Sequence, residues 1–314
     1  MTPTAQLLML FAGLTGVLTL ASATGQVLAG GRLVRLPRPL LANLTRRINA
    51  WWLMVALVGL AFVLGQVGII VLAALVSFAA MREWLSSAPL VRGDHGALVV
   101  SFYVVLPAQY LLLAFGTPAL FSLFIPIAAL VALPVTVAFG DDVQRFAGRV
   151  GTMQWGLMLA VWGLSHLAAL AMLDIPGHEG GGLLLVAFLV LVAQASDVLQ
   201  YVFGMLFGRR PIAPRLSPAK TVEGFVGGAT SATLLGAGLW WLTPFHPLAA
   251  AALACLVVVL GFLGGLVLSA VKRERGLEDW GTAIAGHGGV LDRVDSLILS
   301  APVFFYLVRY FWPA

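Results

Sequence analysis

The sequence is short of charge and of cysteine. Only 10% of its 314 residues are charged and 61% are hydrophobic, whereas soluble domains carry roughly 25% charged residues. The single cysteine, Cys255, excludes a disulfide or a cysteine-based metal site within one chain. The formal net charge is +5, but the basic residues are scattered between apolar runs and form no patch with stacking aromatics, which argues against nucleic acid as a partner.

Long apolar runs make up most of the chain. A bilayer core about 30 Å thick requires about 20 apolar residues per helix, and the runs approach or reach this length. They predict an all-α, polytopic integral membrane protein of about ten transmembrane helices, embedded in a lipid bilayer. The expected segments are residues 7–29, 50–64, 66–80, 97–115, 118–138, 152–172, 182–205, 225–242, 248–270 and 296–312. Gly65-Gln66-Val67-Gly68 divides the second segment from the third and favours a tight helical hairpin, with one long helix as the alternative.

Lys and Arg are distributed unevenly between the connecting segments. With ten helices, 17 of the 18 basic residues lie on one side, and Arg309 near the far end of the last helix is the exception. By the positive-inside rule this side is cytoplasmic, so both termini face out. We therefore expect a multi-pass protein of a bacterial inner (cytoplasmic) membrane, with a polar cavity that faces the cytoplasm.

The N-terminal region contains Ala21-Ser22-Ala23, which resembles a signal-peptidase site. No basic residue precedes the apolar run, as a signal peptide would require, so a retained helix is favoured over cleavage. The predicted organisation is an extra N-terminal transmembrane helix with a basic cytoplasmic loop (residues 1–49), an N-terminal helical bundle (50–150) and a catalytic transmembrane half (151–314).

Polar residues concentrate in two cytoplasmic segments late in the chain, of which the first spans residues 208–224. Ser217 followed by Pro218 is typical of a helix N-cap with proline at the first helical position, so we expect a helix to begin there. Lys220 would lie in its first turn, beside free backbone N–H groups, where a bound anion would relieve the repulsion. The pattern favours phosphate binding over a plain surface turn.

The second polar segment contains Gly286-His287-Gly288-Gly289. Three glycines around a histidine let the backbone approach a ligand and direct its amides at phosphate oxygens. Asp292 and Asp295 follow three residues apart, so they project from one face at the start of the last helix. Two carboxylates beside a phosphate-binding loop indicate Mg²⁺. The alternative is that they cap this helix and pair with Arg293.

Asp197 lies well inside the seventh apolar segment. An acid in that position costs about 3 kcal/mol on insertion scales, so it should face a polar cavity. A structural polar contact with a neighbouring helix is the alternative.

Two stretches resemble the signature motifs of phosphatidate cytidylyltransferases, also called CDP-diacylglycerol synthases. The first, residues 196–224, contains Asp197, a Gly-x-x-x-Gly-Arg run and Ser-Pro-x-Lys-Thr-x-Glu-Gly. The second, residues 269–296, contains Ser269-x-x-Lys272-Arg273, Asp279 and Gly-His-Gly-Gly-x-x-Asp-Arg-x-Asp-Ser. The similarity extends over about residues 45–312 and is strongest from residue 190 onward.

The resemblance implies that a phosphate oxygen of phosphatidate attacks the α-phosphorus of CTP, and it suggests a homodimer. The implied magnesium ligands are Asp292 and Asp295, helped by Asp197. The implied catalytic residues are Asp292, Asp295, Lys272, Arg273 and His287, the last as a hydrogen-bond donor to a phosphate. The implied substrate-binding residues are Ser217, Lys220, Thr221, Ser269, Gly286, Gly288, Gly289 and Arg293.

Two positions depart from the family pattern. Where the family commonly has Gly-Asp, the Asp being a metal ligand, this chain has Gly264-Gly265, and Ala285 replaces a usual proline. The missing carboxylate makes one Mg²⁺ a better expectation than two. Gly261, Gly265 and Ser269 instead form a stripe of small residues suited to close helix packing.

Several other functions are compatible with the chain. A paralogous enzyme could act on another lipid phosphate, and a CTP-dependent polyprenol or phytol kinase uses related chemistry. A catalytically inactive lipid-binding protein is a further alternative. Transport is disfavoured, because transporters show paired broken helices in two related halves, whereas the polar motifs here lie in the second half only.

Overall fold

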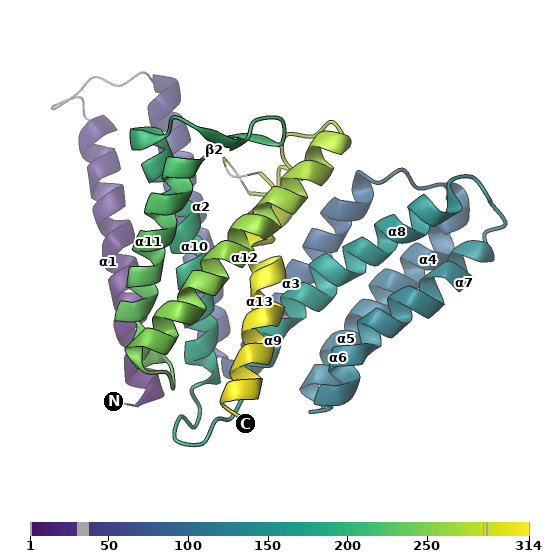
Figure 1. Ribbon diagram of the computed structural model, residues 1–314, viewed down its shortest axis with the longest axis horizontal. Helices are drawn as coiled ribbons and strands as arrows, with labels where there is room; N and C mark the ends of the chain where they lie inside the picture. Colours follow the sequence, from purple (N-terminus) through teal and green to yellow (C-terminus); the bar gives the residue numbers. More distant parts are fainter. Residues whose placement is uncertain (1, 30–37, 285, 287, 314) are drawn as a thin grey trace.

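A computed structural model of the protein describes residues 2–29, 38–284, 286 and 288–313. These residues form helices and one small β-hairpin, which confirms the all-α, polytopic prediction (Figure 1). The first elements are α1 (Pro3–Ala29), α2 (Arg38–Val63), α3 (Gly65–Ser86), η1 (Arg92–Asp94), α4 (His95–Val100), η2 (Ser101–Val105), α5 (Leu106–Ala114), α6 (Pro118–Ile127), η3 (Ala128–Ala132) and α7 (Leu133–Ala138). They are followed by α8 (Phe146–Gly156), η4 (Leu157–Gly163), α9 (Leu164–Ala171), α10 (Gly182–Phe207), β1 (Pro211–Ala213), β2 (Ser217–Thr221), α11 (Val222–Gly238), η5 (Trp240–Leu242), α12 (Pro247–Glu274) and α13 (Leu291–Phe311).

Eight helical spans in the described part are long and apolar enough to cross a membrane. Five are the single helices α1, α3, α10, α12 and α13, and three are built from the consecutive elements α4–α5, α6–α7 and α8–α9. The other two predicted segments are helical but shorter: the apolar part of α2 covers Ile48–Val63, and α11 has 17 residues. The chain is thus a multi-pass membrane protein.

The second and third predicted segments form two helices, α2 and α3, which confirms the hairpin. In Figure 1, α2 descends and α3 rises again beside the central helices. Gly65 at the turn has a φ of +69°, a conformation that glycine adopts without strain. The Gln66 side-chain amide donates to the carbonyl oxygen of Ala171 at 3.1 Å, which fixes the turn against the end of α9.

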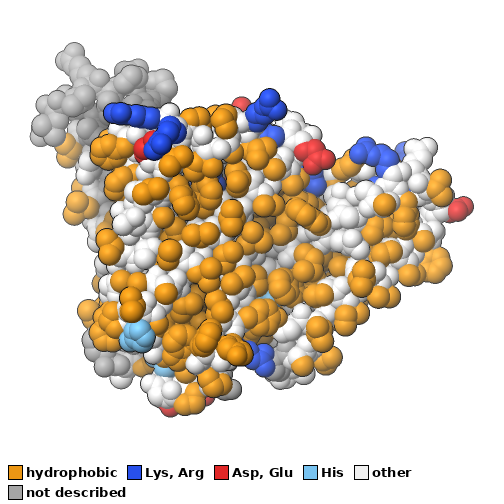
Figure 2. Space-filling view, in the orientation of Figure 1, with side chains coloured by type: hydrophobic (Ala, Val, Ile, Leu, Met, Phe, Trp, Pro, Cys, Tyr) orange, Lys and Arg blue, Asp and Glu red, His pale blue; other side chains and the backbone are white. Residues whose placement is uncertain are grey.

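Charged side chains gather at one end of the helices. In Figure 2, Lys and Arg lie along the upper edge, and hydrophobic side chains cover the wall below them. The β-hairpin lies at this end, whereas both chain termini lie at the opposite end (Figure 1). Arg309 is in the last turn of α13, away from the other basic residues, as the sequence indicated. One face of the protein is therefore charged, and the other carries both termini.

The hydrophobic core runs through the whole bundle. Phe121 of α6, Phe188 of α10 and Phe304 of α13 are all fully buried. The rings of Phe188 and Phe304 stack with their centroids 5.9 Å apart. Because α13 packs against α3 as well as against α9 and α12, the last helix contacts helices from both sides of residue 150. The division at about residue 150 stays a prediction.

A buried ion pair joins two of the helices near the charged face. The Arg149 guanidinium of α8 lies 3.3 Å from the Asp94 carboxylate at the end of η1, and these side chains are 2% and 0% exposed. Arg149 also donates to the carbonyl oxygen of Asp142, and Asp94 accepts the Val91 N–H at 3.0 Å. Because a buried charge without a partner is strongly destabilising, this pair should hold the α7–α8 connection against the start of α4.

Replacing Asp94 with leucine should lower the free energy of unfolding by about 3 kcal/mol, because Arg149 is left buried with only the partly exposed Asp142. The free energy can be measured by titrating SDS into mixed micelles and following the loss of helix. The double variant Asp94→Leu/Arg149→Met should lose less free energy of unfolding than Asp94→Leu alone, since it leaves no buried charge unpaired. Arg82→Met, at an exposed position, is the control and should change stability by less than about 0.5 kcal/mol. Wild-type stability of Asp94→Leu would contradict the assignment.

Candidate active site

The first predicted site segment folds as a β-hairpin, so the prediction of a helix beginning at Ser217 is wrong. Ser217 opens β2 and pairs with Ala213 of β1 in antiparallel register. The helix α11 begins at Val222, and its N-cap is Thr221, whose hydroxyl accepts the Gly224 N–H at 3.1 Å. Strand pairing overrides the Ser-Pro signal, and the cap falls on the next residue that offers a side-chain oxygen.

Glu223 ties the base of the hairpin to α11. Its carboxylate accepts the backbone N–H groups of Arg209 and Arg210 at 2.9 and 3.1 Å, and it pairs with Nε of Arg210 at 2.8 Å. These bonds, led by the one from Arg209, lower the pKa of Glu223 to about 2. The carboxylate is therefore charged throughout the physiological pH range.

Lys220 reaches from β2 towards α12 and the start of α13. Its Nζ lies 4.8 Å from the centroid of the Phe262 ring. Burial lowers the pKa of Lys220, and the neighbouring Asp295 and Asp197 carboxylates oppose that shift. Lys220 does not lie in the first turn of a helix, but the structure brings its ammonium group together with two of the predicted metal ligands.

Asp197 and Asp295 interact electrostatically across two helices, α10 and α13. Asp197 of α10 is exposed, and Asp295 near the start of α13 is half-buried. The two carboxylates interact electrostatically with each other and with Lys220 and Arg293. The two carboxylates repel each other, and a cation between them would relieve that repulsion. The site thus contains two acidic and two basic groups drawn from three separate elements.

Gly264 and Gly265 of α12 border this group of charges. A Cβ at Gly264 would lie 2.5 Å from the backbone carbonyl oxygen of Asp295, so α12 and α13 pack too closely there for a side chain. A Cβ at Gly265 would lie 2.8 Å from Nζ of Lys220 and 3.0 Å from Oδ2 of Asp295. Gly265 therefore faces the charged side chains, and the tightest helix contact is made at Gly264.

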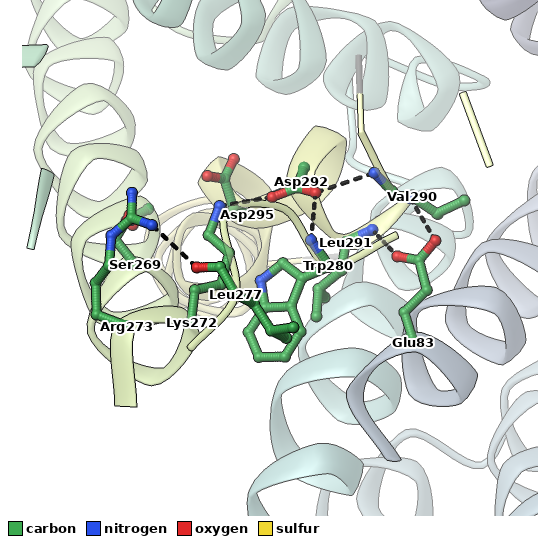
Figure 3. Close-up of polar contacts among 12 residues, drawn as sticks. Glu83, Ser269, Lys272, Arg273, Leu277, Trp280, Val290, Leu291, Asp292 and Asp295 are labelled. Carbon is green, nitrogen blue, oxygen red and sulfur yellow. Dashed lines mark hydrogen bonds and ion pairs between the residues drawn. The ribbon is translucent and has the colours of Figure 1, made fainter. Parts of the chain in front are cut away.

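Asp292 occupies a different environment, only one turn away. It is 8% exposed, and its Oδ1 accepts a hydrogen bond from Nζ of Lys272 at 2.7 Å (Figure 3). Its Oδ2 accepts the backbone N–H groups of Trp280 and Gly289 at 2.8 and 3.0 Å. Asp292 thus pairs with Lys272. Pairing with Arg293 was the alternative to a metal site that the sequence left open.

Hydrogen bonds hold the described part of the glycine loop at Gly288 and Gly289. Gly286 and Gly288 have φ of +76° and +81°, in the region that favours glycine. The Ile284 N–H donates to the Gly288 carbonyl oxygen at 2.9 Å. The Gly289 N–H, one of the amides predicted to contact phosphate, is directed at Asp292. His287 and Ala285 lie outside the described residues.

Ser269 and Arg273, two more of the predicted residues, lie on α12. Ser269 turns its hydroxyl back onto its own helix and donates to the Gly265 carbonyl oxygen at 2.6 Å. Arg273 is exposed and joins the hairpin to α12, with Nε donating to the Leu216 carbonyl oxygen at 3.2 Å. Lys272 and Lys220 interact electrostatically, so the Asp292 and Asp295 environments adjoin.

Sequence reasoning missed Glu83. Its carboxylate, from α3, accepts the backbone N–H groups of Val290 and Leu291 at 2.9 and 2.8 Å (Figure 3). It therefore satisfies amides at the N-terminus of α13, a helix more than 200 residues away in sequence. The available signal was that Glu83 is the single acidic residue of α3, close to the charged end of an apolar helix.

The chemistry of the donor set suits one Mg²⁺ better than two. Among the described residues, no group of three His, Cys, Asp or Glu side chains converges as a metal site. Both oxygens of Asp292 already accept hydrogen bonds. Asp197 and Asp295 remain as two adjacent carboxylates, and Mg²⁺ is commonly held by one or two carboxylates together with substrate phosphates.

The chain is similar to a known protein family over most of its length. The Cytidylyltransferase family matches residues 45–311. The uncharacterized protein YnbB of Escherichia coli is 38% identical over 283 residues, covering 88% of this chain and 91% of YnbB. The phosphatidate cytidylyltransferase of Mycobacterium leprae is 40% identical over 150 residues, and that of Synechocystis is 37% identical over 135 residues. These two alignments cover 47% and 42% of this chain and 46% of each relative, so the chain spans about half the length of these enzymes.

Proposed function

Because the chain belongs to the cytidylyltransferase family, a family of nucleotidyltransferases, we propose that it transfers the cytidylyl group of CTP to phosphatidate, with CDP-diacylglycerol and pyrophosphate as products. The observation that carries the proposal is the meeting of Lys220 with Asp197 and Asp295 at the charged end of a membrane bundle. A lipid phosphate in the bilayer and a nucleotide in the cytoplasm can both reach such a place.

The proposed reaction places few demands on acid–base chemistry. A phosphate oxygen of the lipid forms a bond to the α-phosphorus of CTP, and the bond from that phosphorus to the bridging oxygen breaks, releasing pyrophosphate. A phosphomonoester has a second pKa of about 6 and is largely deprotonated at neutral pH, so no strong base is required. Catalysis then depends on positioning the two substrates and neutralising their negative charge.

The basic residues of the site are suited to that task. In the proposal, Lys220 and Arg293 face the reacting phosphates, while Lys272 and Arg273 contact the distal phosphates of CTP. His287 stays the predicted hydrogen-bond donor to a phosphate. Arg273 is exposed at the mouth of this region, where a nucleotide from solution would first meet it.

We assign Mg²⁺ to Asp295 and Asp197 and give Asp292 mainly the task of holding the loop and Lys272 in place. When bound, Mg²⁺ would neutralise phosphate charge and orient phosphate oxygens. The assignment keeps all three aspartates in the site but separates their roles. It is supported by the hydrogen bonds that already occupy both oxygens of Asp292.

Lipid access is proposed along α10. Its outer surface near Asp197 is apolar and exposed, with Val198, Tyr201 and Met205 at 47, 59 and 69%. The acyl chains of a lipid could stay in the bilayer against this surface while the phosphate reaches a polar cavity at Lys220. The proposed cavity opens to the cytoplasm for CTP and sideways to the bilayer for the lipid.

A related lipid phosphate is the second candidate substrate. YnbB matches this chain over nearly its whole length, whereas the phosphatidate cytidylyltransferases match over about half of theirs. Gly265 also leaves the site without a side chain directly beside Lys220 and Asp295. Both observations distinguish this chain from the phosphatidate cytidylyltransferases that it matches, and they are the reason for testing an enzyme of the same chemistry with another lipid acceptor.

Purified protein supplied with CTP, Mg²⁺ and phosphatidate should release pyrophosphate and form CDP-diacylglycerol. A panel of other lipid phosphates tests the second candidate, and polyprenol tests the kinase alternative, which would release CDP instead.

Asp295→Ala and Asp292→Ala should each reduce turnover by about 100-fold or more. Glu179→Gln, exposed on the opposite face, is the control. An absence of turnover with every lipid would contradict the enzymatic proposal.

Gly265→Asp should strengthen Mg²⁺ binding, because a third carboxylate would stand beside Asp295. We expect the Mg²⁺ concentration for half-maximal turnover to fall roughly tenfold, as added ligand charge raises cation affinity. Gly265→Asn is the matched control, since it has nearly the same size without the charge. If Gly265→Asp and the wild type give the same Mg²⁺ titration, Gly265 has a packing role only.

The proposed orientation in a bacterial inner membrane puts the β-hairpin in the cytoplasm. In a Cys255→Ser background, Ala219→Cys in the exposed part of β2 should react with a membrane-impermeant maleimide only in inside-out vesicles. Glu179→Cys, at the opposite face, should react only in right-side-out vesicles. The reverse pattern would overturn the cytoplasmic placement of the site.

A further inference from the structure

We propose that Glu83 of α3 is a positioning residue that sets the conformation of the glycine loop and of Asp292. The inference rests on the proposed function, because that function makes this loop part of the active site. Glu83 touches neither of the proposed magnesium ligands, so its effect must be transmitted through the loop. Three features of the structure support this role.

The first feature is the pair of hydrogen bonds at the start of α13. The two carboxylate oxygens of Glu83 accept separate amides, Val290 N–H at Oε1 and Leu291 N–H at Oε2. An anion at a helix N-terminus also interacts favourably with the helix dipole. Glu83 thereby fills the place that an anionic ligand could otherwise take at this helix end.

The second feature is the absence of side chains around the Glu83 carboxylate. A Cβ at Gly289 would lie 2.5 Å from Oε2 of Glu83, and a Cβ at Gly281 would lie 2.9 Å from Oε1. Glycine is therefore needed on both sides to admit the carboxylate. Gly281 has no unusual backbone conformation that would by itself call for glycine, so the approach of Glu83 is the reason for it.

The third feature is a second contact made by the same turn of α3. Nη1 of Arg275 donates to the Trp84 carbonyl oxygen at 2.6 Å and to the Ser87 hydroxyl at 2.9 Å. The Arg275 guanidinium lies 4.4 Å from the Trp84 ring, which stacks on Trp280 with centroids 5.2 Å apart. The two ends of the segment between α12 and α13 are thus both attached to the last turns of α3.

These contacts converge on Asp292. The amides that hold its Oδ2 belong to Trp280 and Gly289. Trp280 is stacked on Trp84, and Gly289 directly precedes the amide that Glu83 accepts. Losing Glu83 would free the backbone at Gly289 and weaken its hydrogen bond to Asp292. The position of the Lys272 ammonium, which is bound to Asp292 at 2.7 Å, would then also be less well fixed.

Hydrogen–deuterium exchange of the protein in nanodiscs tests this role without relying on turnover. In Glu83→Ala, amides of residues 288–292 should exchange at least about tenfold faster, since two hydrogen bonds to a charged group are lost. The exchange rates in Glu83→Gln should lie between those of Glu83→Ala and the wild type. The glutamine oxygen can accept one N–H, but its NH2 group presents hydrogen atoms to the other N–H. A role in filling space alone would leave this isosteric variant unchanged. Glu278→Gln, exposed on the same segment, is the charge-matched control.

Gly281→Ala provides an independent check that keeps Glu83 in the chain. Its added Cβ should displace the carboxylate and accelerate exchange at residues 288–292, as Glu83→Gln does. Combined with Glu83→Ala it should have little further effect, because the group it displaces is already gone. Additive effects of the two changes would overturn the assignment, as would wild-type exchange in Glu83→Gln.

Kinetics separate this inference from the proposed function. With an active wild type, Glu83→Gln should lower kcat and raise KM for CTP while KM for the lipid is unchanged, since the proposed function places Lys272, the partner of Asp292, on the distal phosphates of CTP. An equal change in both KM values would overturn the inference. If the wild type turns over no lipid phosphate, the proposed function fails. The exchange experiment then still decides whether Glu83 fixes the backbone of residues 288–292.

Discussion

The neutralisation of one buried carboxylate, Asp292, is the constraint on which the rest of the site depends. A carboxylate that is 8% exposed is tolerated only with a counter-charge and hydrogen-bond donors. Lys272 supplies the charge from α12, and Trp280 and Gly289 supply the amides. Satisfying Asp292 therefore brings together the end of α12, the segment after it and the start of α13. The backbone at Trp280 and at Gly289 is oriented as it is because both N–H groups point at Asp292.

The bilayer adds a second constraint, which places all of this chemistry at one end of the molecule. Polar loops are excluded from the hydrocarbon region, so the hairpin and the glycine loop must lie at helix ends. There the start of α13 meets the last turns of α3, which also end at this face (Figure 1). Glu83 can therefore accept hydrogen bonds from residues far away in sequence while its charge stays outside the membrane core. The same geometry explains why a helix of the N-terminal part contributes to a site whose motifs all lie in the C-terminal part.

The helical class, the charged face, the α2–α3 hairpin and the two motif segments could be predicted from sequence, because each depends on local composition or on a short pattern. Apolar run length identifies the membrane helices, and Gly65 marks a turn. The start of α11 could not be predicted, since pairing of Ser217 with Ala213 is a contact with another strand. The role of Glu83 could not be predicted for the same reason, because its hydrogen-bond partners lie more than 200 residues away in sequence. The separate environments of Asp292 and Asp295 also depend on which helices surround them, which spacing along one helix does not reveal.

The charge balance of the site has a consequence for how Mg²⁺ would be used in the proposed reaction. Asp197 and Asp295 are opposed by Lys220 and Arg293, and Asp292 is opposed by Lys272. Before any substrate binds, these three carboxylates are thus matched by three basic groups, and they leave little net negative charge to retain a free divalent cation. A nucleotide triphosphate brings several negative charges of its own, and these would create the demand for Mg²⁺. In the proposed reaction the cation would therefore enter together with CTP, and an aspartate at position 265 would add a negative charge that Gly265 does not bring.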